Sequence, residues 1–189
     1  MKQEKAELSM HKRQRLFVKQ KWEIWIKDRN ALEKDFKNYL RRENIREGAT
    51  KIEIEGHLNK AKRNLRFSRS VLDDLKDFYE WSIVGYYYGV YQAGLALCAL
   101  KGYKTKSHIA TISILIKFFY PQHLSEEDLK TVAKTIMVEK DIREFVELKN
   151  YREDATYSIS VEYERGLAEN LGEKAIDFVN KVERIIRGD

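Results

Sequence analysis

The chain has 189 residues, of which 43% are hydrophobic and 35% are charged, and only one is a proline. The apolar content excludes a disordered chain, and the high charge with few helix breakers favours long helices with solvated outer faces. With Cys98 as the single cysteine, an intramolecular disulfide is excluded and a thiolate metal site is disfavoured. Because Cys98 lies in an apolar run, we expect a buried side chain rather than a reactive thiol.

The net charge of +6 is concentrated at the N-terminus. Residues 1–49 hold 14 Lys and Arg against 8 Asp and Glu, whereas residues 50–189 hold 22 of each kind. We therefore predict a basic N-terminal helical arm over residues 1–49 and a helical bundle over residues 50–189, and expect an anionic partner at the arm. The first residues lack the apolar stretch of a secretory signal, which leads us to expect a cytoplasmic protein.

The arm is predicted to be helical with a break near residues 28–30, and a basic cluster in it is followed by two tryptophans. Its candidate nucleic-acid contacts are Lys12, Arg13, Arg15, Lys19, Trp22 and Trp25. Basic side chains can neutralise phosphates, and exposed tryptophans can stack on unpaired bases. We favour the alternative in which Trp22 and Trp25 pack on the bundle or on a second subunit. Binding to an anionic membrane surface is a third hypothesis.

After residue 50, most segments show helical spacing. Residues 51–55 alternate like a short strand but have no partner strand nearby, so we expect a loop or an extended connection there. Helices are then predicted from residue 58 to residue 79, over the uncharged residues 82–100, from Ser107 to Pro121, from Ser125 onward to about Tyr157, and over the apolar stripe from 168 to 186. Short connections between helices, without period-two runs, predict an all-α fold: an antiparallel up-and-down bundle of four to five helices with an N-terminal helical extension.

Residues 82–100 carry no charge and are long enough to span a membrane. However, four tyrosines and three glycines are spread through this segment, and tyrosine belongs at membrane interfaces rather than in mid-span. We therefore expect no membrane association and predict the central helix of a bundle. In that helix Gly85 and Gly89 would let a second helix approach closely.

Three segments resemble elements of a known family. Tyr86-Tyr-Tyr-Gly-Val-Tyr-Gln-Ala93 and Lys101-Gly-Tyr-Lys-Thr-Lys-Ser-His108 look like the tyrosine-rich helix and the "KG…KSH" loop of the HEPN family (higher eukaryotes and prokaryotes nucleotide-binding). Tyr151-Arg-Glu-Asp-Ala-Thr-Tyr157 resembles the family's "R-x-x-A-D-Y" element and precedes the last helix, as it does there. The resemblance covers about residues 55–187. It implies a helical bundle, commonly a homodimer, that is often encoded beside a minimal nucleotidyltransferase in a two-component, toxin–antitoxin-like system.

The resemblance also implies candidate chemistry, because a subset of the family are metal-independent ribonucleases with an Arg followed four to six residues later by a His. Here Arg152 is present, Tyr157 lies five residues further on, and no His follows His123. A tyrosine, with a reference pKa of about 10, is a poor base near pH 7. We therefore predict a module that binds a nucleotidyltransferase, a nucleotide or RNA through a groove near Arg152. The alternative is a ribonuclease in which Arg152 and Tyr157 are catalytic. Structural alternatives are a salt bridge for Arg152 and a core-edge position for Tyr157.

A small phosphate- or nucleotide-binding corner is a further hypothesis at the loop before residue 109. It would consist of Lys104, Lys106, Ser107 and His108, with Ser107 at a helix start that favours anions. The alternative is that Ser107 only caps the helix and His108 packs under the loop. No histidine pair has metal-ligand spacing, and no glycine-rich phosphate loop occurs in the sequence, so we expect neither a metal nor a cofactor.

Overall fold

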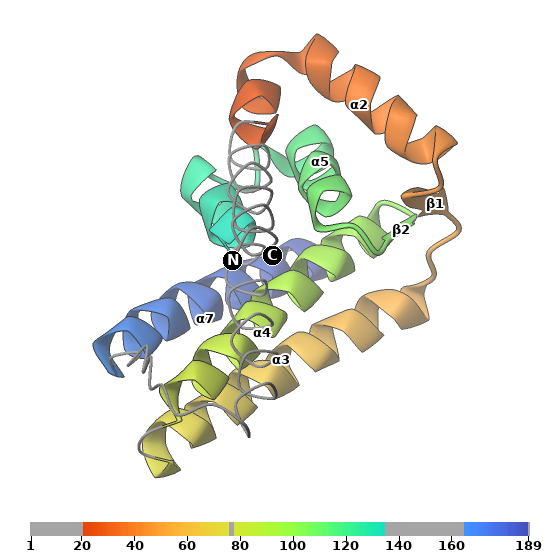
Figure 1. The fold of residues 1–189 in the computed structure, drawn as a ribbon. Coiled ribbons are helices and arrows are strands. Elements are labelled where there is room, and N and C mark those ends of the chain that lie inside the picture. Colours follow the sequence, from red (N-terminus) through yellow and green to blue (C-terminus); the bar gives the residue numbers. More distant parts are fainter. Residues whose placement is uncertain (1–20, 76–77, 135–164, 189) are drawn as a thin grey trace, which may run out of the picture.

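The computed structural model describes residues 21–75, 78–134 and 165–188, and these are almost wholly helical (Figure 1). The all-α prediction is confirmed, with one small two-stranded sheet in addition. In chain order the elements are a helical segment over residues 21–27, α2 (Arg29–Arg41), β1 (Ile45–Glu47), α3 (Lys51–Asp74), α4 (Tyr79–Leu100), β2 (Tyr103–Thr105), α5 (His108–Phe119), helical residues 126–134 and α7 (Arg165–Arg187).

Helices α3, α4 and α7 lie side by side and form the body of the molecule (Figure 1). One end is marked by a cluster of Leu72, Ile83 and Ala168, and further along α3 and α7 Lys62 pairs with Glu183. Helix α3 therefore runs antiparallel to both α4 and α7, and α4 and α7 run in the same direction. The chain between α4 and α7 includes α5, which packs on α4 and α2.

The predicted close approach of two helices occurs where α3 crosses the glycines of α4. A Cβ atom on Gly85 would lie 2.1 Å from Oγ of Ser68, and one on Gly89 would lie 3.0 Å from Leu65. The absence of a side chain at these two positions thus sets the distance between α3 and α4. Helix α7 also approaches α4 closely, since a Cβ on Gly172 of α7 would lie 2.7 Å from the ring of Tyr86.

Helix α4 is long and apolar enough to cross a membrane, but 78% of its most apolar window is buried inside the structure. Its buried residues face α3, α5 and α7 in turn, so apolar positions occur all round the helix. Cys98 is fully buried here, and burial raises the pKa of its thiol far above the ordinary value. The prediction of an unreactive cysteine in a central core helix agrees with this geometry.

The expectation of a loop or extended connection over residues 51–55 is wrong, because these residues form the first turn of α3. The Thr50 hydroxyl accepts from the backbone N–H of Glu53, and the Glu53 carboxylate accepts from the N–H of Thr50 at 2.9 Å. This capping box satisfies two backbone donors that a helix start would leave unpaired. The alternating pattern was misleading because Ile52 is 83% exposed and does not face the core.

The predicted absence of a sheet is also corrected. Strands β1 and β2 pair antiparallel, with Ile45 opposite Thr105 and Glu47 opposite Tyr103. The backbone N–H of Ala49 then donates to the carbonyl of Gly102 at 3.0 Å, which extends this contact beyond the strands. Each strand has only three residues, too short for an alternating pattern to be visible in the sequence.

The described part of the N-terminal arm packs on the bundle. Trp22 and Trp25 are 3% and 1% exposed and share one hydrophobic core with residues of α4, α5 and α7. The indole N–H of Trp25 donates to Asp35 at 3.0 Å, so its polar atom is satisfied. Arg29, in the first turn of α2, donates to the carbonyls of Ile116 and Tyr120 at the end of α5. The predicted helix break is present at Asp28, which caps α2.

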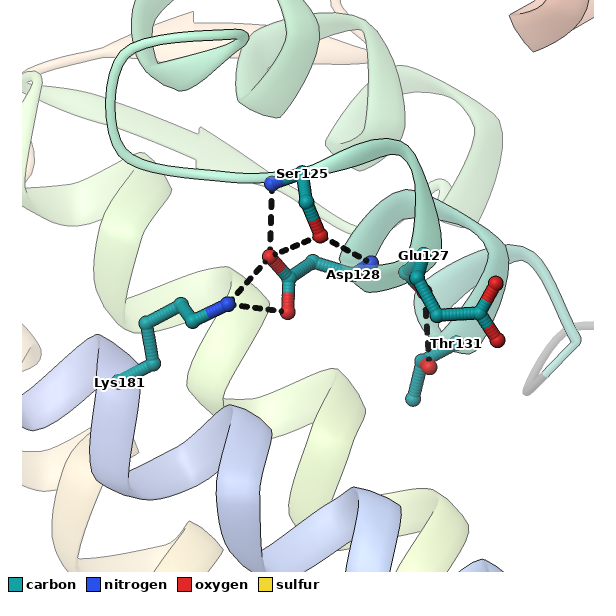
Figure 2. Close-up of polar contacts among 5 residues, drawn as sticks. All are labelled: Ser125, Glu127, Asp128, Thr131 and Lys181. Carbon is teal, nitrogen blue, oxygen red and sulfur yellow. Dashed lines mark hydrogen bonds and ion pairs between the residues drawn. The ribbon is translucent and has the colours of Figure 1, made fainter.

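The carboxylate of Asp128 links the segment after α5 to α7 (Figure 2). The predicted capping box is present: Asp128 accepts from the N–H of Ser125 at 2.7 Å, and the Ser125 hydroxyl accepts from the N–H of Asp128. The same carboxylate pairs with the Lys181 ammonium of α7 at 2.6 Å. Burial raises the pKa of Asp128, but the hydrogen bonds from Lys181 and Ser125 outweigh it and hold the pKa below its ordinary value.

Candidate functional site

The loop between α4 and α5 is fixed by a glycine turn and by hydrogen bonds between hydroxyl side chains and the backbone. Helix α4 ends at Leu100 with Lys101 as its C-cap, Gly102 follows with a φ of +82°, and β2 leads the chain on to Ser107. Ser107 caps α5 by accepting from the N–H of Ala110, and its own N–H donates to the Thr105 hydroxyl at 3.0 Å. The capping alternative for Ser107 is therefore realised, and the hydroxyl is engaged with the backbone of α5.

The two lysines of this loop have different surroundings. Lys104 pairs with Glu53 of the α3 capping box at 2.8 Å. The hydrogen bond from Lys104, together with those from Thr50, lowers the pKa of the Glu53 carboxyl below its usual value. Lys106 is exposed and forms no ion pair with the part of the chain that the structure describes. Within that part, Lys106 is thus the better placed of the two to meet an anion.

His108 is packed against α4. Its Nε2 lies 2.5 Å from the hydroxyl of Tyr87, and its ring stacks on Tyr91 with centroids 3.9 Å apart. Tyr87 and Tyr91 are one helical turn apart, so both lie on the same side of α4. The alternative in which His108 packs under the loop agrees with these contacts. The tyrosine-rich segment therefore has a packing role, because Tyr87 and Tyr91 both stack with the ring of His108.

A small depression lies beside the same loop. It is lined by the start of α3, the end of α4 and strand β2, including Glu53, His57, Leu95 and Lys104. Nδ1 of His57 lies 2.7 Å from the side-chain oxygen of Gln92, which fixes the imidazole at the rim. Among residues 21–75, 78–134 and 165–188, no three His, Cys, Asp or Glu side chains come together so that they could hold a metal ion.

Of the other candidate site residues, only Trp22 and Trp25 lie within the described part of the chain. Arg152 and Tyr157 lie outside the described residues, as do the arm's Lys12, Arg13, Arg15 and Lys19. Their predicted roles stay predictions. Trp22 and Trp25 are in the core, so their rings are not available for stacking on bases in this structure.

Helix α3 carries a charged surface that was not predicted from the sequence. Residues 56–72 contain five Lys and Arg and no Asp or Glu, although residues 50–189 as a whole are balanced. Lys60, Arg63 and Arg66 of this stretch are exposed at intervals of three residues on the outer side of the helix. A sliding charge count along the chain would have found this segment, whereas a count over the whole bundle hides it.

The model of the HEPN domain family matches residues 54–186, from the first turn of α3 to the last turn of α7. The chain belongs to the HEPN domain family. The resemblance inferred from the tyrosine-rich helix and the KSH loop is confirmed, and the matched part of this HEPN chain is the part built on α3, α4, α5 and α7.

One curated protein is similar over most of its length. "Putative toxin MJ0142" of Methanocaldococcus jannaschii is 26% identical over 137 residues, which is 72% of this chain and 83% of the relative.

Proposed function

We propose that this HEPN chain is the binding component of a two-component, toxin–antitoxin-like system. In this proposal it forms a homodimer, binds a minimal nucleotidyltransferase, and holds a nucleotide or RNA in a groove near Arg152. It does not cleave RNA by itself.

One observation carries the proposal. The HEPN match runs through Arg152, yet the residues four to six positions later are Thr156, Tyr157 and Ser158, none of which is a histidine. Metal-independent cleavage needs a base for the 2′-hydroxyl proton and a cation for the phosphorane. The chain retains the cation and lacks the usual base, which supports binding rather than catalysis.

The decisive test combines a cleavage assay with recovery of partners. The full chain, purified from its native host, is expected to co-purify with a nucleotidyltransferase and with nucleic acid. When freed of its partner and incubated with total RNA and EDTA, it is expected to leave the RNA intact. Cleavage at a rate above that of a buffer control would overturn the binding-only assignment.

The proposed dimer is tested separately by size-exclusion chromatography with light scattering. The chain mass is 22.5 kDa, so a dimer is expected at about twice that value at micromolar concentration. A stable monomer across this concentration range would remove the homodimer from the proposal.

A ribonuclease is the second candidate, and the word toxin in the name of the Methanocaldococcus relative favours it. In this case Arg152 would stabilise the phosphorane and either Tyr157 or His108 would act as the base. Arg152→Ala is then expected to abolish cleavage. Tyr157→Phe and His108→Ala distinguish the two bases, because only the substitution of the true base changes the pH profile of the rate. Unchanged cleavage by Arg152→Ala would rule out this candidate.

A further inference from the structure

The outer side of α3 is a cationic surface on which most basic side chains form no ion pair with described residues. Of the five basic residues between 56 and 72, Lys62 pairs with Glu183 and Arg69 pairs with Asp73. The remaining three, Lys60, Arg63 and Arg66, are exposed and form no ion pair with the part of the chain that the structure describes. Three like charges on adjacent turns repel one another, and an anionic ligand would relieve that repulsion.

Two exposed aromatic rings border this surface. Phe67, on α3, is 51% exposed, and Trp81, on α4, is 41% exposed. Phe67 lies over Gly85, since a Cβ there would be 3.0 Å from its ring, and Trp81 precedes Gly85 by about one helical turn. Phe67 directly follows Arg66 and lies one helical turn after Arg63 on α3. Trp81 lies in the first turn of α4, beside the end of α3, so the two rings follow the contact between these helices.

We propose that the outer face of α3, together with Trp81, binds single-stranded RNA. The phosphates would contact Lys60, Arg63 and Arg66, which rise about 4.5 Å per three residues along the helix. Unpaired bases would stack on Phe67 and Trp81, because every base has a flat apolar face that an aromatic ring can cover. The inference shares with the proposed function only the ligand class, RNA, and assigns the contact to residues other than Arg152.

The combination of groups favours RNA over an acidic protein partner. Charge alone would suit either polyanion. Exposed rings beside regularly spaced cations match the two recurring elements of single-strand recognition, a basic track and a stacking platform. Neither Phe67 nor Trp81 forms an aromatic pair with another described residue, so neither ring is already stacked on one.

The test measures binding of a fluorescently labelled single-stranded oligoribonucleotide to the full chain over a range of salt concentrations. The triple variant Lys60→Ala, Arg63→Ala, Arg66→Ala is expected to bind about a hundredfold more weakly at 0.1 M salt, and the slope of log affinity against log salt should fall by about 2. Alanine favours helix, so α3 should stay formed, as circular dichroism can verify. The matched control is Lys34→Ala, Lys37→Ala, Arg41→Ala, which removes the same charge from exposed positions of α2 and should retain binding.

The aromatic part is tested by Trp81→Ala, with Trp81→Phe as the variant that keeps a ring. The first is expected to lose about tenfold in affinity without a change in salt slope, and the second should lose much less. Equal binding by the wild type and the triple variant would overturn the proposal. So would an effect of the control triple variant as large as that of the α3 triple variant.

The two proposals can fail separately. If Arg152→Ala abolishes RNA binding and the α3 triple variant binds normally, the α3 surface is eliminated and the groove near Arg152 stands. If the α3 triple variant loses binding and Arg152→Ala retains it, the RNA contact is on α3 and the groove is not the RNA site. A wild-type chain that binds no RNA eliminates both RNA sites and leaves only the partner-binding part of the proposed function.

Discussion

Nε2 of His108 lies 2.5 Å from the Tyr87 hydroxyl, and the imidazole stacks on Tyr91 one helical turn further along α4. This contact joins the start of α5 to the middle of the central helix. Two of the family's recognisable segments, the tyrosine-rich helix and the KSH loop, are thus in direct contact. Their joint occurrence in the sequence has a packing explanation that does not depend on catalysis.

Tyr87→Phe is expected to reduce the free energy of unfolding by about 1 kcal/mol, because it removes one hydrogen bond from a largely buried tyrosine and keeps the ring. The measurement is urea denaturation followed by circular dichroism. Tyr88→Phe is the matched control, since the Tyr88 ring contacts Tyr87 but its hydroxyl bonds no described residue. The control should change stability by less than about 0.5 kcal/mol. Equal effects of the two variants would show that the Tyr87 hydroxyl contributes nothing specific.

Gly85→Ala is expected to destabilise the fold by about 1 to 3 kcal/mol, because the new Cβ would lie 2.1 Å from the Ser68 hydroxyl oxygen in the α3–α4 interface. Thermal unfolding can measure the loss. Gly56→Ala is the opposite case: this glycine is exposed in the first turns of α3 with nothing near its Cβ position, so stability should rise by about 0.5 to 1 kcal/mol.

A double variant tests the cause of that loss. Ser68→Ala combined with Gly85→Ala removes the clashing oxygen, which in the described residues has no hydrogen-bond partner, and should recover part of the stability. If the double variant is less stable than Gly85→Ala alone, the steric explanation is wrong.

Trp25→Ala is expected to cost about 3 to 5 kcal/mol, because the indole is fully buried in the core shared with α4, α5 and α7. The neighbouring Ile24 is 50% exposed, so Ile24→Ala should cost far less. Both are measured by chemical denaturation of the full chain. A small effect of Trp25→Ala would mean that residues 21–41 do not contribute to the core in solution. By the same reasoning, a chain that starts at residue 50 should be much less stable than the full chain.

The parts of the fold predicted correctly are those set by local chemistry. Ser107 and Ser125 each have the side chain and the spacing that cap a helix, and both caps are present. Gly85 and Gly89 predicted a close helix contact because a missing side chain has few other uses in a helix interior. These signals need no knowledge of what lies far away in the sequence.

The parts predicted wrongly or missed depend on distant residues. The start of α3 was obscured because Ile52 and Ile54 alternate with charges, although Thr50 and Glu53 carry the stronger helix-start signal. Strand β1 pairs with a segment nearly sixty residues away, and three residues are too few to show a pattern.

For the candidate site, the sequence could name residue types but not their partners. Lys104 looked like a phosphate ligand until the fold placed Glu53 2.8 Å from it, and the cations of α3 were hidden by an overall charge balance. Arg152 and Tyr157 lie outside the described residues, so their roles rest on the sequence and on the family match.

Lys181→Met tests the link between α7 and the segment after α5. Above the ordinary carboxyl pKa of 3.8, the variant should be about 1 to 2 kcal/mol less stable than the wild type, because Asp128 loses a charge-assisted hydrogen bond at a position where it is nearly buried. The folded pKa of Asp128 is lowered, so this stabilisation is complete above pH 3.8 and is lost as the pH falls through the lower folded value. The stability difference between the two proteins should therefore be constant from pH 5 to 7 and shrink below about pH 4.

The matched control is Lys130→Met, since Lys130 forms a solvent-exposed pair with Glu127 at 3.5 Å on the same helical segment. Exposed pairs of this kind contribute little, so its effect should stay below about 0.5 kcal/mol at all pH values. Urea denaturation at a series of pH values gives both curves. A difference for Lys181→Met that persists unchanged to pH 2 would show that the lysine acts through packing of its alkyl chain, because a packing contribution does not require Asp128 to be ionised.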